Sequence, residues 1–371
     1  MANNNKHTGS NVPALRFPEF SGEWEKVKLG DSCTFFSGGT PSSSRKEYYC
    51  GEIPFIRSGE IHSDSTALSI TKEAFASCSA KMVNKGDLLL ALYGATSGDI
   101  SISRINGAIN QAILCIRPKH LNAYFIKSLW ESHKKQILET YLQGGQGNLS
   151  SEIIKNISFI FPNIEEQNKI SELVRKIDKR IETQSKIIEE QETLLKSLAD
   201  KLISAQLANV ALCECVEAKA STMKESELDS SGEFPVYGAS GLCGFCSDAL
   251  EESDSILITK DGSGVGTCQY ATEKHSFLGT LCSLTAKENV YLPYIYYALL
   301  NFNFASYKTG QAIPHIYFKD YGKATIYCPS YVEQIRIASG LKKLDAKINA
   351  DIELLKQYRL QKEFLLSRMF I

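Results

Sequence analysis

The sequence lacks the segments that carry a chain into or across a membrane. No uninterrupted apolar run of about 18 residues occurs in its 371 residues, which excludes an ordinary transmembrane helix. The start, MANNNKHTGSNVPALRFPEF, has no basic-then-apolar secretion signal, so residues 1–24 are expected to form a polar tail. The eleven cysteines, an odd number, are therefore expected to stay reduced in a cytoplasmic protein.

The motifs of several enzyme classes are missing as well. No G-x-x-x-x-G-K-[ST] loop occurs, which argues against nucleotide hydrolysis. There is no Asn/Asp-Pro-Pro-aromatic methyltransferase motif and no Gly-x-Ser-x-Gly nucleophile elbow. The glycine-rich run at 262–266 lacks the spacing of a dinucleotide fingerprint, so a tight turn is favoured over a nucleotide cradle.

What the sequence does contain is an internal repeat. Residues 161–203 and 328–370 show the same pattern of residue types when the first stretch is shifted by 167 positions. The matching positions include Pro162 with Pro329, Glu166-Gln167 with Glu333-Gln334, Ile170 with Ile337, Asp178 with Asp345, and Ile181 with Ile348. The chain therefore consists of two similar halves, each a globular block followed by a helical arm.

Apolar heptads predict that both arms are long helices that pair as a coiled coil. An arm of roughly 37 residues would span about 55 Å, and neither stripe has a partner within its own half. We therefore expect the arms, residues 161–207 and 329–371, to pack antiparallel on each other. Two helices of an ordinary globular core remain the alternative. The predicted interface comprises Val174, Ile181, Ile188, Leu195, Leu202, Leu341, Ile348, Leu355 and Met369.

The two globular blocks, residues 25–160 and 208–328, also resemble each other. Each contains a short buried-strand run, a glycine-rich turn, a second strand, an aromatic helix-like run and a polar Gly-Gln loop. Each ends in a strand that leads into its arm. Strands and helices mixed irregularly within about 120 residues predict an α+β fold.

Charge alone does not indicate nucleic-acid binding, because the net charge is −1. Residues 1–160 carry +3, 161–210 carry −1, 211–328 carry −6, and 329–371 carry +3. Any contact of the second block with a phosphate backbone must therefore come from local clusters.

Several segments carry a family resemblance. They are RFPEFSGEWEKVKLGD (16–31), FFSGGTPSSS (35–44), EIPFIRSGEI (52–61), PVYGASGLCGF (235–245) and ILITKDGSGVG (256–266), together with the Pro-x-x-x-Glu-Gln start of each arm. Their order and the twofold layout, over residues 14–371, resemble the specificity subunit of type I restriction-modification enzymes.

The resemblance implies a non-catalytic DNA-binding subunit. Two target-recognition domains would each read half of a bipartite site in double-stranded DNA, and the helical arms would set their separation. The arms would also dock two methyltransferase subunits, with restriction/translocase subunits completing the complex. S-adenosylmethionine, ATP and Mg²⁺ would be bound by those partners. A coiled-coil adaptor without DNA recognition is the alternative, and an unrecognised enzyme is a second one.

Polar side chains on loops are the candidates for DNA contact, since such groups read base edges or bind phosphates. In the first block they are Ser37, Thr40, Ser43, Arg45, Lys46, Arg57, Tyr93, Thr96, Ser97, Asn110, Gln111, Gln143 and Gln146. In the second block they are Tyr237, Ser240, Lys260, Ser263, Thr280, Lys308, Gln311 and His315. Several of these, such as Tyr237 and Gln146, could brace the fold instead.

Cys243 and Cys246 form a C-x-x-C pair, which can bind zinc or perform redox chemistry. A structural zinc site requires a second ligand pair, and Cys213-Glu-Cys215 has the wrong spacing for one. A structural role is therefore favoured for the pair, and no metal site is predicted.

Overall fold

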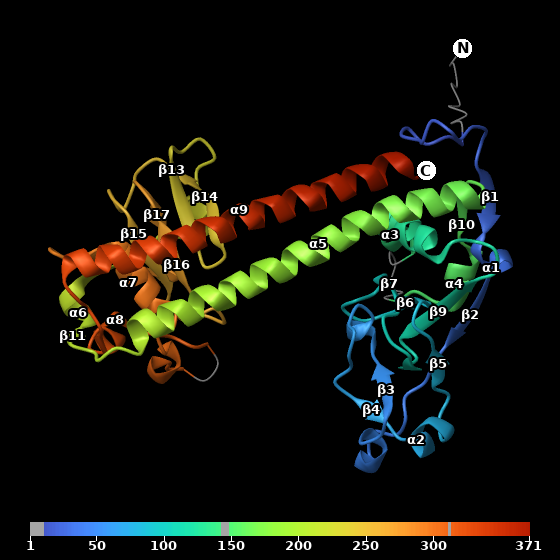
Figure 1. Cartoon of the computed structure of the whole chain (residues 1–371), viewed down its shortest axis with the longest axis horizontal. Coiled ribbons are helices and arrows are strands. Elements are labelled where there is room, and N and C mark those ends of the chain that lie inside the picture. The colour runs from blue at the N-terminus through green and yellow to red at the C-terminus, as the bar shows by residue number, and fades with distance from the viewer. Residues whose placement is uncertain (1–10, 142–147, 311–312) are drawn as a thin grey trace. The chain divides into compact units, whose positions relative to one another are not determined.

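The computed structural model describes residues 11–141, 148–310 and 313–371. The chain divides into two compact units, one formed by residues 1–183 and 355–371 and the other by residues 184–354. Both units mix helices and sheets, so the predicted α+β class is confirmed (Figure 1). The division cuts through both long helices instead of separating them from the globular blocks.

The first unit contains two four-stranded sheets. Their strand orders are β2-β9-β6-β7, which is antiparallel throughout, and β4-β3-β8-β5, in which β3 and β8 are parallel. A third, two-stranded sheet pairs β1 with β10. The strands are β1 (Glu25–Lys28), β2 (Cys33–Ser37), β3 (Ile53–Ile56), β4 (Ser69–Ile70), β5 (Lys81–Val83), β6 (Leu88–Ala91), β7 (Ile100–Ile102), β8 (Gly107–Ile109), β9 (Ile113–Pro118) and β10 (Ser158–Phe161). The helices of the block are α1 (Leu29–Ser32), α2 (Lys72–Ala76), α3 (Ala123–Tyr141) and α4 (Ser151–Asn156), with 3₁₀ turns at Lys46–Tyr49 and Ser58–Glu60.

The second unit repeats the main elements of this topology, but its second sheet has three strands, β14-β13-β17, instead of four. The sheet β12-β18-β15-β16 corresponds to β2-β9-β6-β7, and the parallel pair β13 and β17 corresponds to β3 and β8. The strands are β11 (Val210–Ala211), β12 (Val216–Ala220), β13 (Phe234–Gly238), β14 (Gly241–Cys246), β15 (Ser255–Thr259), β16 (Cys268–Ala271), β17 (Ser276–Phe277), β18 (Leu281–Ala286) and β19 (Thr325–Ile326). The helices are α6 (Leu212–Cys215), α7 (Leu292–Leu299) and α8 (Phe318–Tyr321), with 3₁₀ turns at Glu225–Glu227 and Phe304–Tyr307.

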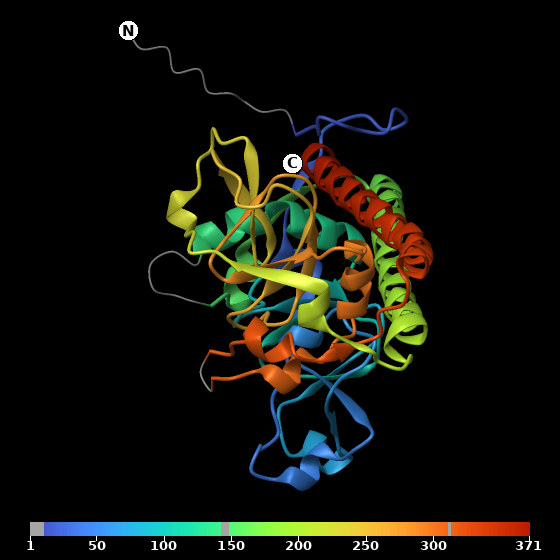
Figure 2. The ribbon, with the colours of Figure 1, turned by 90° about the vertical axis from the view of Figure 1, so that its left-hand side faces the viewer.

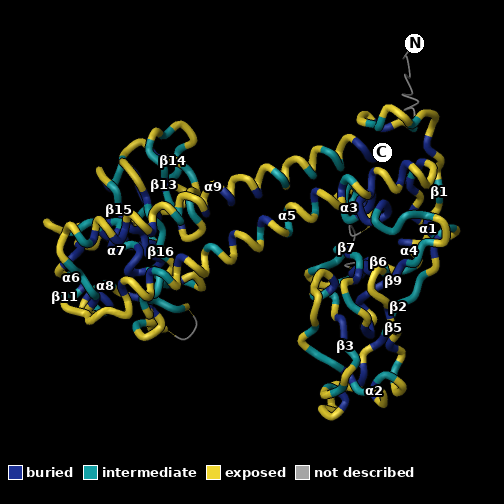
Figure 3. The backbone as a smooth tube through the Cα atoms, in the orientation of Figure 1, coloured by how far each residue is buried: buried dark blue, intermediate teal, exposed yellow. Residues whose placement is uncertain are grey.

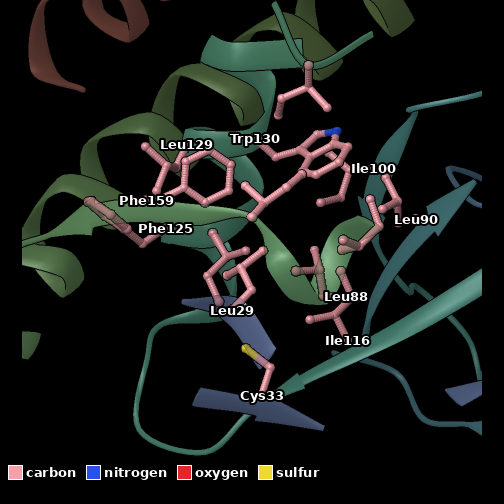
Figure 4. Close-up of a cluster of buried hydrophobic side chains, with 14 of the residues drawn as sticks. Leu29, Cys33, Leu88, Leu90, Ile100, Ile116, Phe125, Leu129, Trp130 and Phe159 are labelled. Atoms are coloured by element: carbon pink, nitrogen blue, oxygen red, sulfur yellow. The ribbon is translucent and has the colours of Figure 1, made fainter. Parts of the chain in front are cut away.

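The core of the first unit lies between its antiparallel sheet and helix α3. Leu88, Leu90 and Ile116 from the sheet belong to one buried cluster with Phe125 and Trp130 from the helix (Figure 4). The indole nitrogen of Trp130 donates a 2.9 Å hydrogen bond to the carbonyl of Gly98. The helix therefore holds the turn that follows β6 in place, as well as covering the sheet.

Residues 11–24 pack on the first unit, which differs from the expected polar tail. Trp24 is buried, and the Leu15 backbone N–H donates to the carbonyl of Arg368 at 2.9 Å. The Arg16 guanidinium donates to both carboxylate oxygens of Glu166, at 2.8 and 2.7 Å. Because the Glu166 side chain is fully buried, it needs this cation, which holds the segment against the first long helix.

The two arms are the long helices α5 (Ile164–Ala199) and α9 (Tyr331–Met369). In the first unit, the C-terminal end of α9 lies beside the N-terminal half of α5 (Figures 1 and 2). Asp178 meets Lys362 there, and Arg180 lies under the ring of Tyr358, so the two helices run antiparallel. In the second unit, Gln184 and Gln191 of α5 both donate to Asp351 of α9.

Most of the predicted interface residues are buried. These are Val174, Ile188, Leu195, Leu341, Ile348, Leu355 and Met369, while Ile181 is half-buried. Leu202 is a wrong prediction, because it is 41% exposed. Helix α5 ends at Ala199, and a π-turn follows at Asp200–Ser204, in which the Ala205 N–H donates to the Asp200 carbonyl. The wider turn displaces the stripe by one residue, so Ile203 is buried instead.

The Glu-Gln motif at the start of each arm has a structural explanation. The buried Gln167 donates its side-chain N–H to the carbonyl of Pro162, and its side-chain oxygen accepts from the backbone N–H of Asn122. Gln334 makes the same two bonds, donating to Pro329 and accepting from Tyr291. Each glutamine therefore ties the start of a long helix to the segment that begins the preceding helix.

Replacing Gln334 by Leu should lower the free energy of unfolding by about 2 kcal/mol, because the partly buried Pro329 carbonyl and Tyr291 N–H both lose this hydrogen-bond partner. Urea unfolding followed by circular dichroism measures the change. Gln361→Leu, at an exposed position of α9, is the control and should change stability by less than about 0.5 kcal/mol. Equal effects of the two substitutions would show that the bonds of Gln334 do not hold the helix.

A partly buried ionic cluster links the two long helices of the first unit to helix α3. Lys362 occupies the heptad position between Leu355 and Met369, and its ammonium group lies 2.8 Å from Asp178 and 3.0 Å from Glu131. Lys127 of α3 contacts the same two carboxylates, at 3.1 and 2.8 Å. Although burial opposes its ionisation, the two lysines and the Tyr124 hydroxyl lower the pKa of Asp178 below 3.8.

The equivalent carboxylate of the second unit has the opposite environment. Burial raises the pKa of Asp345 above 3.8, opposed only in part by a 3.3 Å hydrogen bond from the Tyr297 hydroxyl. The repeat therefore places one aspartate where its charge is stabilised and the other where its charge is disfavoured.

Asp178→Asn should destabilise the chain at neutral pH by about 3 kcal/mol, because it leaves a partly buried cationic pair with too little negative charge. Asp345→Asn should leave stability unchanged or raise it, since it removes a charge that burial disfavours. Urea unfolding of both variants measures the contrast.

The two aspartates should also change the stability of the chain with pH in opposite directions. The contribution of Asp178 is present above its unfolded pKa and is lost as the pH falls through its lowered folded pKa. Asp345 binds its proton more tightly in the folded chain, so it adds stability as the pH falls through its raised pKa. Equal loss of stability in both variants would contradict the assignment.

Candidate nucleic-acid interface

Each block carries the same glycine-rich turn after a fully buried strand. After β6, the N–H groups of Ala91 and Gly98 bond the carbonyls of Asp99 and Ala91, both at 2.8 Å. After β15, Thr259 and Gly266 donate in the same way to Thr267 and Thr259, both at 2.9 Å. The glycines that begin and end each turn have positive φ: 87° and 80° at Gly94 and Gly98, and 93° and 92° at Gly262 and Gly266.

One residue next to each turn joins three loops through its backbone. The Leu92 N–H donates to the carbonyl of Ala112, and the Leu92 carbonyl accepts from Leu149, at 2.8 and 2.9 Å. In the second block, Lys260 makes the same pair of bonds, with Thr280 and Ile316, both at 2.9 Å. We call this arrangement the three-loop clamp: residues 92–99, 110–112 and 148–149 in the first block, and 260–267, 278–280, 309–310 and 313–316 in the second.

In the first block, the clamp gathers five of the sequence-predicted residues. They are Tyr93, Thr96, Ser97, Asn110 and Gln111. Gln111 is exposed and accepts a 2.5 Å hydrogen bond from the Thr40 hydroxyl, which brings the loop after Ser37 and β2 to the clamp. Ser97 and Asn110 bond the backbone of their own turns, with Leu92 and Ala112 respectively. In the structure, these two side chains therefore hold the backbone of their turns in place.

The other candidates of the first block lie on a separate segment. Exposed Ser43 and Lys46 flank Arg45, whose guanidinium donates to the Tyr48 hydroxyl at 2.6 Å. Tyr48 belongs to the core of the second sheet, which therefore holds this segment in place. Arg57, after β3, forms a 3.0 Å ion pair with Glu60. Its charge is therefore balanced locally.

In the second block, Lys260, Ser263, Thr280 and His315 lie on the clamp. Ser263, Thr280 and the nearby Lys308 are exposed. Exposed Ser240 lies on the turn between β13 and β14, which Gln269 holds by donating to Gly238 and Ala239. Tyr237 instead packs against the buried Leu257 cluster, with its ring 5.8 Å from that of His275. It braces the fold.

Asp261 is a clamp residue that was not among the predicted ones. Its carboxylate lies 2.6 Å from Nδ1 of His315, which connects the first and third loops of the clamp through side chains. The signal was present in the repeat, since Asp261 stands where the first block has Tyr93. Gln143, Gln146 and Gln311 lie outside the described residues.

Metal and nucleotide sites find no support in the described parts of the chain. No group of three or more His, Cys, Asp or Glu residues that could hold a metal ion occurs in them. The thiols of Cys243 and Cys246 donate to separate backbone carbonyls, those of Val236 and of Asp248. In the turn at 262–266, the N–H groups of Gly262, Val265 and Gly266 already bond carbonyls of the chain. They cannot cradle a phosphate without breaking those bonds.

No helix within 11–141, 148–310 and 313–371 is long and apolar enough to cross a membrane.

Comparison with known families explains the repetition. The model of the type I restriction modification DNA specificity domain matches residues 21–193 and again residues 209–357. The chain belongs to this family. The two matches contain one three-loop clamp each, so the clamp is a repeated feature of the specificity domain in this chain.

Relatives of the family cover the chain to different extents. The specificity subunit of type I restriction enzyme MjaIX from Methanocaldococcus jannaschii is 28% identical over 191 residues, which are 48% of this chain and 43% of the relative. The matched part thus spans less than half of that relative's length. The EcoprrI specificity subunit of Escherichia coli is 22% identical over 89% of this chain and 90% of its own. The type I S subunit structure from M. genitalium has the same fold, with a TM-score of 0.67 at 20% identity, covering 97% of this chain and 99% of its own.

Gly266→Ala should destabilise the second block by about 2 kcal/mol, because φ is positive and the added Cβ would lie 2.8 Å from the Cβ of Phe304. Gly264→Ala is the matched control in the same turn, where the nearest atoms lie at 3.8 Å and φ is not in the left-handed range. Thermal unfolding of the two variants should separate them. A Gly264 variant as unstable as the Gly266 variant would refute the strained-turn explanation.

Proposed function

We propose that this chain is the DNA sequence-specificity subunit of a type I restriction-modification system. Each block reads one half of a bipartite target in double-stranded DNA through its three-loop clamp. The observation that carries the proposal is one backbone frame with different side chains. Leu92, Tyr93 and Asn148 in the first block are replaced by Lys260, Asp261 and His315 in the second. A constant frame with variable polar loops is what two readers of different sequences require.

The side chains of the second clamp are suited to base edges and phosphates. Lys260 supplies a cation within a segment whose net charge is −6, and Ser263 and Thr280 supply exposed hydroxyl groups. Hydroxyls and cations are the groups that contact DNA most often. Asp261, opposite His315, can accept a hydrogen bond from an exocyclic amino group such as that of cytosine.

The subunit has no catalytic role in this proposal. Two methyltransferase subunits perform the base chemistry on adenines that are flipped out of the DNA, and they bind the S-adenosylmethionine. Restriction/translocase subunits, which bind ATP and Mg²⁺, complete the assembly. We place the complex in the cytoplasm, where reducing conditions keep all eleven cysteines as the free thiols seen in the structure.

Exposed apolar residues of the long helices are suited to hold those partners. Apolar side chains interrupt their polar surfaces, and Figure 3 shows exposed residues recurring along both helices. An exposed apolar residue repeated along a helix marks an interaction surface when several gather there. The residues are Ile164, Ile187 and Leu194 on α5, and Tyr331, Val332, Ile335, Ile352, Leu354, Leu360 and Phe364 on α9.

A block exchange tests the proposal. Residues 25–160 are replaced by the equivalent block of a family member with a known target, and the methylated sites are mapped in cells that supply the modification partner. The cut points are suitable because β1 and β10 pair with each other, which brings the start and end of the block together. The expected result is a target in which one half-site changes and the other is kept.

The equivalent exchange of residues 208–328 is the matched control, since β11 and β19 also pair. It should change the other half-site only. If either exchange altered both half-sites, the assignment of one reader to each block would fail. If the wild-type chain supported no methylation and its assembly did not depend on DNA, the coiled-coil adaptor would be favoured.

A further inference from the structure

One side-chain pair joins two loops of the second clamp. Nδ1 of His315 lies 2.6 Å from a carboxylate oxygen of Asp261, and an antiparallel bridge connects the two backbones. Because an ionised carboxylate can only accept, the proton of this bond is on Nδ1 of the imidazole. The second ring nitrogen, Nε2, has no hydrogen-bond partner in the part of the chain that the structure describes. The pair therefore leaves one ring nitrogen and one carboxylate oxygen available to a ligand.

The backbone around His315 fixes the position of its ring. The N–H and carbonyl groups of Thr309 and His315 bond each other in both directions, at 2.9 and 2.8 Å. Gly310 has a φ of 88°, and a Cβ there would collide with the carbonyl of Ile313 and lie 3.2 Å from Cδ2 of His315. The chain thus packs closely against the ring, so the pair is held in one arrangement before any ligand binds, and little freedom is lost on binding.

The pair is open to solvent, and its charged neighbours come from two loops. The side chains of His315 and Asp261 are 36% and 32% exposed, so both can meet a ligand from outside. Lys260 precedes Asp261 on the first loop, and Lys308 precedes the strand-like pairing on the third, while the second loop contributes the uncharged Thr280. Asp261 is the acidic group next to the ring, so it can balance the charge of an imidazolium.

The hydrogen-bonding code of the major groove selects the base pair that fits these two groups. A carboxylate needs an amino group, and cytosine offers one at N4 without the adjacent N7 acceptor that adenine carries. The guanine paired with that cytosine presents two acceptors, O6 and N7, which need a donor. A neutral imidazole with its proton on Nδ1 presents a lone pair at Nε2, whereas an imidazolium presents an N–H. The two side chains therefore complement a C·G pair when the ring is protonated.

Resting on the proposed function of the second block as a DNA reader, we propose that Asp261 and His315 together read one C·G base pair of the second half-site. Asp261 accepts a hydrogen bond from the cytosine amino group, and the protonated His315 donates one from Nε2 to guanine. Because this contact needs a proton on the ring, the affinity for the target falls as the pH rises from about 6 to about 8. The first block has Tyr93 and Asn148 at these positions, which cannot form an ion pair with each other, so the pH dependence belongs to the second half-site.

DNA binding by the unaltered chain, assembled with its modification subunits, is the first test. Fluorescence anisotropy measures the affinity for a duplex that carries the mapped target, at about pH 6 and about pH 8. Each C·G pair of the second half-site is then replaced by T·A in turn. One replacement should lower the affinity at the lower pH about tenfold and remove most of the pH dependence, whereas changes in the first half-site should leave that dependence in place. A second half-site without a C·G pair, or equal affinities at both pH values, would overturn the proposal.

Variants assign the effect to the two side chains. His315→Gln keeps an N–H donor but has no proton to gain, so its DNA affinity should no longer change with pH. Asp261→Asn replaces an acceptor by an amide that also donates, and methylation mapping should show the preference for cytosine lost at one position of the second half-site. Asp248→Asn, at an exposed position outside the clamp, is the matched control and should change neither result.

The outcomes separate this proposal from the proposed function. If the Asp261 and His315 variants keep the wild-type second half-site and its pH dependence, the pair does not read DNA, although the chain would still be a specificity subunit. If methylation does not depend on the wild-type chain at all, the proposed function fails and the base contact fails with it.

Discussion

The constraint on which this chain depends is that neither long helix can bury its apolar stripe within its own repeat. A helix of 36 or 39 residues with a heptad stripe needs a second helix along its length. The structure satisfies this need by packing α5 and α9 on each other in both units, in antiparallel directions. The globular blocks are attached to this pair at fixed points, because Gln167 and Gln334 bond each helix start to the block that precedes it.

Polar residues inside the stripe make the pairing specific. Apolar contacts tolerate displacement along a helix, whereas a buried polar group needs its partner at one position. Lys362 meets Asp178 and Glu131 in the first unit, and Asp351 meets Gln184 and Gln191 in the second. The polar contacts between the helices therefore differ between the two units, both in charge and in partner. We infer that these contacts fix the register of the helices.

Much of the fold was predictable because the relevant signals are local and periodic. The heptads located both helices, and the repeat predicted two similar α+β blocks, which share the strand order of one four-stranded sheet. The failures have identifiable causes. The π-turn after Ala199 exposed Leu202, and a heptad pattern cannot reveal a one-residue insertion in a turn. Lys362 was overlooked because a lysine in the stripe looks like a gap until its two carboxylates are seen.

The candidate site was predictable in kind but not in composition. The glycine-rich turns marked the right loops, yet only the backbone bonds of Leu92 and Lys260 showed which three loops meet. The sequence left open whether Tyr237 reads DNA or braces the fold, and it did not indicate that Arg57 is paired with Glu60. Such outcomes depend on contacts between residues that are distant in sequence or on side-chain direction, neither of which a loop's polarity reveals.

The central claim is that two copies of one frame read two separate pieces of DNA. Mapping modified bases across the genome of cells that carry this subunit and its modification partner, with and without the gene for this chain, tests it most directly. The account predicts a methylated motif made of two short specific parts separated by an unspecified gap of constant length, which vanishes when the gene is removed. One uninterrupted motif, or a methylation pattern that does not depend on this chain, would contradict it.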